Sequence, residues 1–345
     1  MNFFFGKKIR CNNEFHHRNI HVLDNFLLLS FGYPELIDCI KINNGKVHIN
    51  YDNPRAIYKI SKVLLHYRYK ITWKIPRGFL VPTIPSRVNY VHYIADLLTP
   101  EHIFNTEETK GLFSKTCLPH KTGIKHETEF CSVKTYLIPT GRQIFGLDIG
   151  VGANCIFPIL CNSIYSWSMV GTDISTESLF ISNSIIEINN LSDSIKLIHQ
   201  KNVDQILVGI LDHPKISNTY FAFSICNPPF YSSNEDSINS THPNRSRSCK
   251  EYEVITIGGE FNFLLKLYKQ SKNFQKRVIW FTSQVSKLKN IKKLREIFRY
   301  ELCSKKLEAT RIISLKQGKH EKWVLAWSFY NKEERISLLK FLRCN

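Results

Sequence analysis

The sequence predicts an α/β protein built on a parallel sheet, and two observations carry this prediction. From residue 144 onward, apolar stretches of strand length alternate with amphipathic stretches of helix length. That alternation is typical of a parallel sheet with helices on its faces. Two of the expected strands, 144–149 and 220–226, run into short segments rich in glycine or proline. Such segments at the carboxyl ends of strands favour a ligand site there.

Residues 1–98 precede this pattern and predict a basic arm followed by a small α+β layer. Apolar side chains recur at helical spacing, once directly after an Asn-Pro pair that is typical of a helix start. Two shorter stretches alternate as half-buried strands do. We expect helices at 23–42, interrupted by Gly32 and Pro34, from Pro54 onward and at 87–98, with strands at 46–51 and 69–75.

Residues 99–142 are polar and carry scattered glycine and proline residues. A stretch of that length is long for a loop in a compact domain, so we expect an insertion or a linker. Residues 143–345 then form the larger α/β domain. Its expected strands are 144–149, 167–172, 195–199, 220–226, 277–282, 311–315 and 323–330, and its expected helices are 153–163, 176–190, 258–271 and 288–298.

The first candidate site is the four-residue clamp Asn227-Pro228-Pro229-Phe230, which follows the strand 220–226. The two prolines end the strand and stiffen the backbone. The Asn227 side-chain oxygen and the Pro228 carbonyl can each accept a hydrogen from an exocyclic amino group, while Phe230 offers a stacking face. The clamp therefore predicts a site for a planar, amino-bearing ring. The alternative is a strand-ending turn with a phenylalanine in the core.

The second candidate site lies where the strand 144–149 enters Asp148-Ile149-Gly150-Val151-Gly152. Gly150 and Gly152 permit a tight turn and a close approach of the backbone to a ligand. The next strand ends in Asp173, where an acid can bind two ribose hydroxyls, although Asp173 could instead cap the following helix. No phosphate-binding Lys-Ser/Thr follows the glycines, which favours a nucleoside cofactor without phosphates.

Together the two sites predict S-adenosylmethionine as cofactor and methylation of an amino group as the reaction. Arg87, at the start of an expected helix, could hold the carboxylate of the cofactor. Asp204, after the strand 195–199, could meet its adenine end. A surface arginine and a loop aspartate are the competing interpretations of these two residues.

The composition favours a polyanionic partner. In 345 residues, 47 Lys and Arg against 29 Asp and Glu give a net charge of +18, so nucleic acid is expected. No uncharged apolar run approaches the roughly 18 residues of a membrane helix, and we expect neither secretion nor a membrane partner. The ten cysteines never form Cys-x-x-Cys, which predicts reduced thiols and no metal site.

Two basic segments are candidates for gripping phosphates, and both are also compatible with solvated chain. A third basic segment, 316–322, joins the last two expected strands. The candidates are Lys7, Lys8, Arg10 and Arg18 in the amino-terminal arm, and Arg245 and Arg247 in the loop after the clamp.

Two other functions fit part of the same pattern. A protein glutamine-amide methyltransferase also favours an Asn-Pro-Pro-aromatic clamp, but the charge of +18 argues against it. An RNA-binding protein that has lost catalysis is the other, and the complete clamp and glycine turn argue against that.

These stretches resemble the family of methyltransferase-like protein 16 and the bacterial RlmF enzymes, which methylate adenine N6 in structured RNA. The likeness spans residues 1–330 apart from 99–142. Its segments are 81–90 (VPTIPSRVNY), 148–153 (DIGVGA), 226–230 (CNPPF), 258–260 (GGE), 316–318 (KQG) and 326–329 (AWSF).

The resemblance implies a seven-stranded, Rossmann-like methyltransferase sheet whose last two strands form an antiparallel hairpin, with the small α+β extension binding RNA. It implies that Arg87, Gly150, Asp173 and Asn227 touch the cofactor. It also implies that Lys319 and Lys322, beside Lys316, face RNA. Lysine stands there where the family carries arginine, which loses bidentate recognition.

The resemblance also bears on the substrate. The sequence ends soon after the last expected strand, without the C-terminal region of vertebrate members, so we expect U6 small nuclear RNA, a splicing RNA, as the substrate. Ribosomal RNA is the alternative. We expect a monomer located in the nucleus, or in the cytoplasm for a bacterial-type member.

Overall fold

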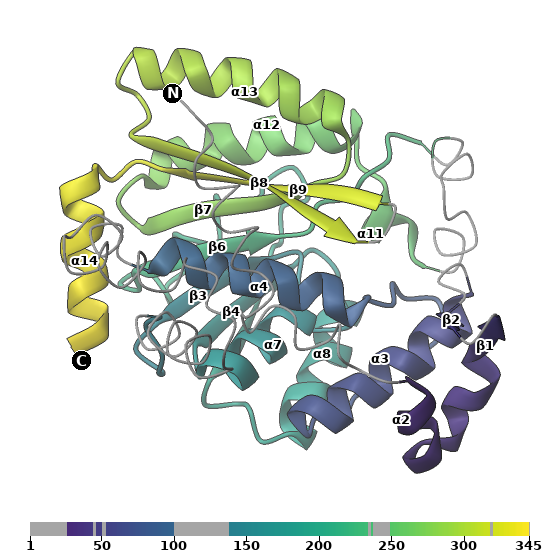
Figure 1. Cartoon of the computed structure of the whole chain (residues 1–345). Coiled ribbons are helices and arrows are strands. Elements are labelled where there is room, and N and C mark those ends of the chain that lie inside the picture. Colours follow the sequence, from purple (N-terminus) through teal and green to yellow (C-terminus); the bar gives the residue numbers. More distant parts are fainter. Residues whose placement is uncertain are drawn as a thin grey trace, which may run out of the picture.

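A computed structural model describes residues 26–43, 46–49, 53–99, 138–233, 236, 249–317 and 320–344. The described chain forms one seven-stranded sheet with helices on both faces, and a small amino-terminal layer packs beside it (Figure 1). This confirms the predicted fold class.

The sheet has the order β5-β4-β3-β6-β7-β9-β8. Its first five strands are parallel, and β9 pairs antiparallel with both β7 and β8. From β3 the sheet is extended to one side by β4 and β5 and to the other side by β6. The order of the strands therefore reverses beside β3, and the carboxyl ends of β3, β4 and β6 meet at this switch point. The strands are β3 (Phe145–Ile149), β4 (Ser168–Asp173), β5 (Ile195–His199), β6 (Phe221–Cys226), β7 (Val278–Val285), β8 (Ala309–Gln317) and β9 (His320–Ser328).

Helices cover the two faces of the sheet, and each face has its own apolar core. In Figure 1, α12 and α13 lie on one side, while α4 and α7 lie on the other. The central strands β4 and β6 are buried along their whole length, as expected for strands covered on both faces. The helices of this part are α7 (Ile156–Tyr165), α8 (Thr176–Ile188), α11 (Glu251–Val254), α12 (Gly259–Ser271), η4 (Lys272–Phe274), α13 (Leu288–Cys303) and α14 (Lys332–Cys344).

The amino-terminal layer begins with short elements and ends with two longer helices. Asn53 caps α3 as predicted, because its side-chain oxygen accepts the backbone N–H groups of Arg55 and Ala56. The elements are α2 (Phe26–Gly32), η2 (Pro34–Cys39), β1 (Ile40–Asn43), β2 (Lys46–Ile49), α3 (Pro54–Tyr69) and α4 (Ile84–Leu98).

The strand predicted at 69–75 is wrong, for an identifiable reason. Ile71, Trp73 and Ile75 are buried and the residues between them are exposed, so the predicted alternation is real. However, this extended segment pairs with no strand among the residues that the structure describes. Its backbone at Thr72 exchanges two hydrogen bonds of 2.8 Å with the side-chain amide of Asn189, just after α8. An amide side chain takes the place of a neighbouring strand.

Other boundaries also differ from the prediction. The helix expected at 87–98 begins three residues earlier, at Ile84, with Pro85 in its first turn. The stretch 23–42 divides at Gly32 into a helix, a 3-10 turn and the first residues of β1. The helix α14 follows the last strand and was not expected, since its apolar face is short.

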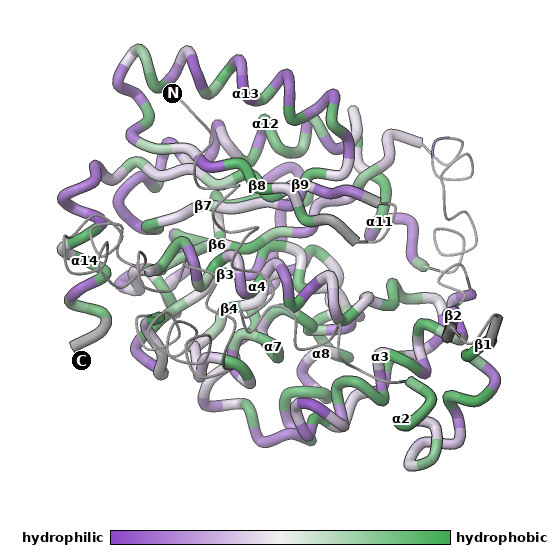
Figure 2. The backbone as a smooth tube through the Cα atoms, in the orientation of Figure 1, coloured by the Kyte–Doolittle hydropathy of each residue, from purple (hydrophilic) through white to green (hydrophobic). Residues whose placement is uncertain are grey.

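The hydropathy of the elements agrees with their positions. Figure 2 shows hydrophobic and hydrophilic residues alternating along α13, whose apolar residues Ile291, Leu294 and Phe298 are buried. In the described part of the chain, no helix has both the length and the apolar character needed to cross a membrane. Nor do His, Cys, Asp and Glu residues cluster there as a metal site would require.

Candidate active site

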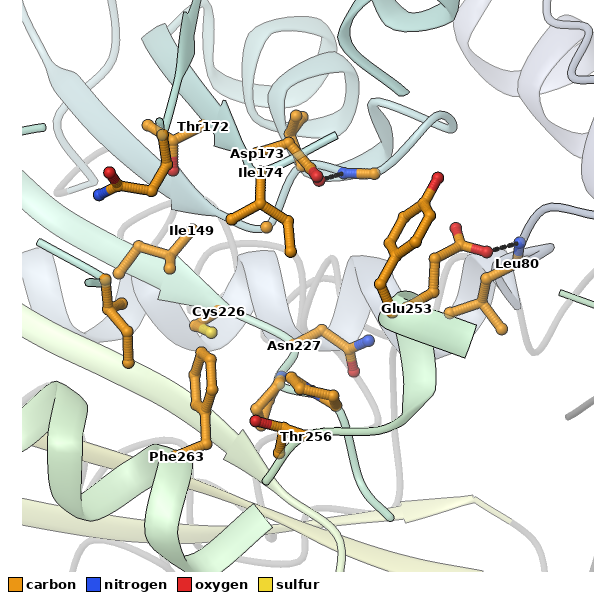
Figure 3. Close-up of a pocket in the computed structure, with 18 of the residues that line it drawn as sticks. Leu80, Ile149, Thr172, Asp173, Ile174, Cys226, Asn227, Glu253, Thr256 and Phe263 are labelled. Atoms are coloured by element: carbon orange, nitrogen blue, oxygen red, sulfur yellow. Dashed lines mark hydrogen bonds between the residues drawn. The ribbon is translucent and has the colours of Figure 1, made fainter. Parts of the chain in front are cut away.

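A cavity of about 840 Å³ opens at the carboxyl ends of β3, β4 and β6, where the topology predicts a ligand site. That volume lies in the range of ligand pockets, roughly 300–1,000 Å³. Figure 3 shows Asp173, Asn227 and Glu253 around this hollow. The cavity brings together most of the predicted site: Arg87, Gly150, Gly152, Asp173, Asp204, Asn227, Pro228 and Pro229 all line it.

The glycine turn forms the floor of the cavity. Gly150 has a φ of 76° and Gly152 a φ of 61°, a conformation that favours glycine. The backbone N–H groups of Gly150 and Val151 both donate to the carbonyl of Thr172, at 2.9 and 2.8 Å. These bonds attach the turn to the end of β4, so the two strand ends hold their residues in fixed relative positions.

Asp173 stands at the end of β4 and is 8% exposed. One carboxylate oxygen accepts the N–H of Gly152 at 2.8 Å, and the other accepts the N–H of Ser175 at 2.9 Å. Burial raises the pKa of Asp173, and these backbone hydrogen bonds oppose that rise. Ser175, rather than Asp173, is the N-cap of α8. Each oxygen of Asp173 keeps a second lone pair for a ligand hydroxyl.

Arg87 and Asn227 are in direct contact. Nη1 of Arg87 donates to Oδ1 of Asn227 at 2.8 Å and to Oε1 of Gln284 at 2.7 Å. The guanidinium is buried, and its central carbon lies 5.4 Å from the ring centre of Phe157. The interpretation of Arg87 as a surface arginine is therefore wrong, since the side chain is buried and fixes the amide of the clamp. Its contact with the cofactor carboxylate stays a prediction.

The clamp leaves β6 directly after Cys226 and is held from the other side by α11. The backbone N–H groups of Phe230 and Tyr231 both donate to the carbonyl of Val254, each at 2.9 Å. The ring of Phe230 is half-buried and does not line the cavity. The Lys322 ammonium lies 5.3 Å from its centre, which brings one predicted RNA-facing lysine onto the stacking ring.

Asp148 does not line the cavity. It is 1% exposed, and neither carboxyl oxygen has a hydrogen-bond partner among the described residues. Burial raises the pKa of Asp148 well above its usual range; the charge of Asp173 adds to the rise and that of Arg87 opposes it. Asp148 lies behind the turn, so contact with the cofactor stays a prediction.

Glu253, which the sequence did not single out, lines the cavity from α11. Its Oε2 accepts the backbone N–H groups of Leu80 at 2.8 Å and of Lys250 at 3.1 Å. Burial raises the pKa of Glu253 to about 7; these bonds and the Lys250 charge oppose the rise, and the Asp173 charge adds to it. The bond to Lys250 is a local helix-capping contact, whereas Leu80 lies 173 positions away, so the sequence alone does not connect Glu253 with the cavity.

The remaining predicted residues are less tightly placed. Asp204 is exposed at the cavity, where its backbone N–H donates to Asn202. Lys316 lies in β8, where its backbone pairs with Glu321, and its side chain is not described. The candidates outside the described residues are Lys7, Lys8, Arg10, Arg18, Arg245, Arg247 and Lys319.

Comparison with known proteins extends this picture. A family model described as an RNA methyltransferase matches residues 9–113 and 131–331. The chain belongs to this family. Among its relatives is the ribosomal RNA large subunit methyltransferase F of Bacteroides fragilis, 37% identical over 335 residues, which cover 92% of this chain and 99% of the relative. The protein of that name from Psychromonas ingrahamii is 34% identical, covering 94% of this chain and 97% of its own.

Solved structures of RNA methyltransferases also resemble this chain. The human Mettl16 catalytic domain in complex with a MAT2A 3′UTR hairpin has a TM-score of 0.68 at 26% identity, covering 91% of this chain and 95% of that one. The N-terminal domain of human METTL16 in complex with SAH has a TM-score of 0.63 at 26% identity, covering 91% and 97%. The cofactor of the family is S-adenosylmethionine, as predicted from the glycine turn and Asp173.

Proposed function

We propose that this enzyme methylates the exocyclic N6 of an adenosine in large-subunit ribosomal RNA. The observation that carries the proposal is the position of Asn227, Pro228 and Pro229, which line the cofactor cavity at the end of β6. An amide oxygen and a peptide carbonyl beside a cofactor site suit an amino group that must give up a proton.

The residues of the cavity fit S-adenosylmethionine, which supplies an electrophilic methyl group when bound. The two glycines present bare backbone, and Asp173 offers a carboxylate for ribose hydroxyls. Arg87 is a buried cation for the carboxylate of the methionine end.

The clamp acts on the adenine amino group, whose lone pair is delocalised into the ring. Oδ1 of Asn227 has two lone pairs, of which Arg87 occupies one, so the second remains for an amino hydrogen. The Pro228 carbonyl accepts the other hydrogen in our proposal. Both contacts draw the nitrogen toward a tetrahedral arrangement and expose its lone pair, and its proton leaves to solvent afterwards. The catalytic contribution is mainly positioning.

The target base must leave its stack to enter the clamp. In our proposal the ring of Phe230 offsets part of this cost by stacking on the base. Lys322 then lies beside the base or its phosphate, since its ammonium is already at that ring. The basic residues of the arm and of the two loops are proposed to hold the RNA backbone.

The relatives support ribosomal RNA over the U6 small nuclear RNA expected from the sequence. Proteins named ribosomal RNA large subunit methyltransferase F reach 37% identity along nearly the whole chain, whereas the human METTL16 structures reach 27%. With a bacterial-type ribosomal substrate we propose a cytoplasmic rather than a nuclear location. U6 small nuclear RNA remains the second candidate, supported by the likeness to METTL16 with a bound RNA hairpin.

The decisive experiment is methylation of four RNAs with labelled cofactor: protein-free large-subunit ribosomal RNA, U6 small nuclear RNA, and a variant of each with the mapped adenosine changed to guanosine. We expect label in N6-methyladenosine of the ribosomal RNA at a single position. Preferential labelling of U6 RNA would transfer the proposal to the second candidate, and label on protein glutamine would overturn it.

A further inference from the structure

We propose that Glu253 binds the α-ammonium group of S-adenosylmethionine and thereby selects the amino-acid end of the cofactor. The inference deepens the proposed function and rests only on its cofactor, not on its RNA. It starts from the charges around the cavity and from an oxygen of the half-buried Glu253 carboxylate that accepts no hydrogen bond from the described residues.

The methionine end of the cofactor carries one carboxylate and one ammonium, so a complementary wall offers one cation and one anion. Arg87 supplies the cation. Four acidic side chains on the wall compete for the second role. Asp173 has an N–H donor on each oxygen and stands at the end of β4, where the ribose is expected. Asp204 and Glu251 are exposed.

Glu253 is the fourth, and its two oxygens differ. Oε2 accepts the N–H groups of Leu80 and Lys250, which fix the carboxylate in place. Oε1 accepts no hydrogen bond from any described residue. A Cβ placed on Gly152 would stand 3.8 Å from Oε1, so this oxygen faces the glycine turn at the cavity floor. The N–H groups of Leu80 and Lys250 thus orient the carboxylate without supplying a positive charge to Oε1.

The surrounding charges explain why this carboxylate lacks a cation. The ammonium of Lys250 is paired with Glu177 at 3.1 Å and lies over the ring of Phe79. The other charged neighbour, Asp173, is repulsive. Burial with no paired cation raises the pKa of Glu253 to about 7. A ligand ammonium at Oε1 supplies the missing charge, and it lowers that pKa again.

The protonation of Glu253 is coupled to cofactor binding. Near pH 7 a part of the cofactor-free molecules carries a proton on Glu253, and the ammonium requires the ionised form. Cofactor binding near that pH therefore releases a fraction of a proton per site, and binding weakens as the pH falls further.

Calorimetry on the RNA-free full chain tests this with S-adenosylhomocysteine and its desamino analogue, in two buffers of different ionisation enthalpy. We expect the wild-type protein to prefer S-adenosylhomocysteine by about 10- to 100-fold, the worth of one charged hydrogen bond, and to release protons at pH 7. Glu253→Gln keeps an acceptor for Leu80 and Lys250, so it is expected to fold; it should bind both ligands alike and release none.

Glu296→Gln on α13 is the matched control, because it removes one negative charge from an exposed side chain outside the cavity lining and should leave preference and proton release unchanged. Wild-type preference in the Glu253→Gln protein would overturn the proposal and leave Glu253 as a structural link to Leu80. Because no RNA is present, a wrong RNA substrate would leave these outcomes intact.

Discussion

Arg87 donates a 2.8 Å hydrogen bond to Oδ1 of Asn227, so the residue proposed for the cofactor carboxylate also fixes the residue proposed for the target amine. One nitrogen, Nη1, makes this bond and the bond to Gln284. Arg87→Lys keeps a positive charge but loses the planar fork that reaches both. We expect single-turnover methylation to fall about 10- to 100-fold, since about 1.5–3 kcal/mol is lost with a charged hydrogen bond.

The control for Arg87→Lys is RNA affinity, which we expect to stay within about twofold, because Arg87 is buried beneath the clamp. A variant that methylates at the wild-type rate would show that Asn227 does not need this neighbour.

Asn227→Ala should abolish methylation and leave RNA binding nearly unchanged. It removes an acceptor at the amino group, while the basic residues that we propose to hold RNA remain. Phe230→Ala should also suppress turnover, through a poorly held base, since stacking contributes about 1–3 kcal/mol per base. Single-turnover rates with saturating enzyme separate chemistry from binding. Normal rates in the Asn227 variant would eliminate the proposed clamp.

Asp173→Ala should weaken cofactor binding by about 1.5–3 kcal/mol for each charged ribose hydrogen bond lost. Titration calorimetry of the RNA-free protein measures this loss. Because Asp173 also accepts the N–H groups of Gly152 and Ser175, thermal unfolding must be followed in parallel. Undiminished cofactor affinity would leave Asp173 with the role of holding the glycine turn alone.

Lys322 lies at the stacking ring, so its loss should affect the preferred RNA more than a scrambled one. Neutralising Lys7, Lys8 and Arg10 should instead weaken the binding of both RNAs alike. The slope of log affinity against log salt concentration should become shallower by up to about 0.7–0.9 per lost phosphate contact. Affinities for both RNAs across a salt series test this, with Lys292→Ala on the exposed face of α13 as control. Equal losses for both RNAs with Lys322→Ala would contradict a position beside the target base.

Glu253 predicts an unusual pH dependence of stability. Its pKa rises on folding from the ordinary 4.5 to about 7, so the folded protein retains a proton that the unfolded chain releases. The cofactor-free protein therefore loses stability as the pH rises through this window. Glu253→Gln cannot ionise, and at pH 8 it should exceed wild type in free energy of unfolding by about 1–3 kcal/mol. Urea titrations at pH 5 and pH 8 check this; a gap that does not widen with pH would exclude the buried carboxylate as its source.

Much of the sheet was predictable because buried strands and their ends leave local patterns. The Asp148–Gly152 segment begins inside the largely buried strand β3, and the clamp follows the buried strand β6. The topology then brings the two segments together without further information. The false strand at 69–75 shows the limit of this reasoning, since alternating burial does not reveal whether the partner is a strand or, as here, the side chain of Asn189.

The contacts inside the site could not be predicted in the same way, because they join residues distant in sequence. The Arg87–Asn227 bond spans 140 positions and the Glu253–Leu80 bond 173. Neither local spacing nor composition encodes such a pair. The resemblance implied that Lys322 faces RNA, but it did not predict that its ammonium lies at the ring of Phe230.

The carbonyl of Val254 holds the N–H groups of both Phe230 and Tyr231, and the preceding residue is Glu253. One residue, Val254, thus joins Glu253 on the cavity wall to the backbone of Phe230. Binding free energies are reciprocal, so any gain in RNA affinity caused by cofactor must be matched by an equal gain in cofactor affinity caused by RNA. S-adenosylhomocysteine, the product of the cofactor, keeps the ribose and the ammonium. We therefore expect it to stabilise the same Glu253–Val254 segment and to delay the release of methylated RNA. The cellular ratio of S-adenosylmethionine to S-adenosylhomocysteine would then set the turnover rate of this enzyme.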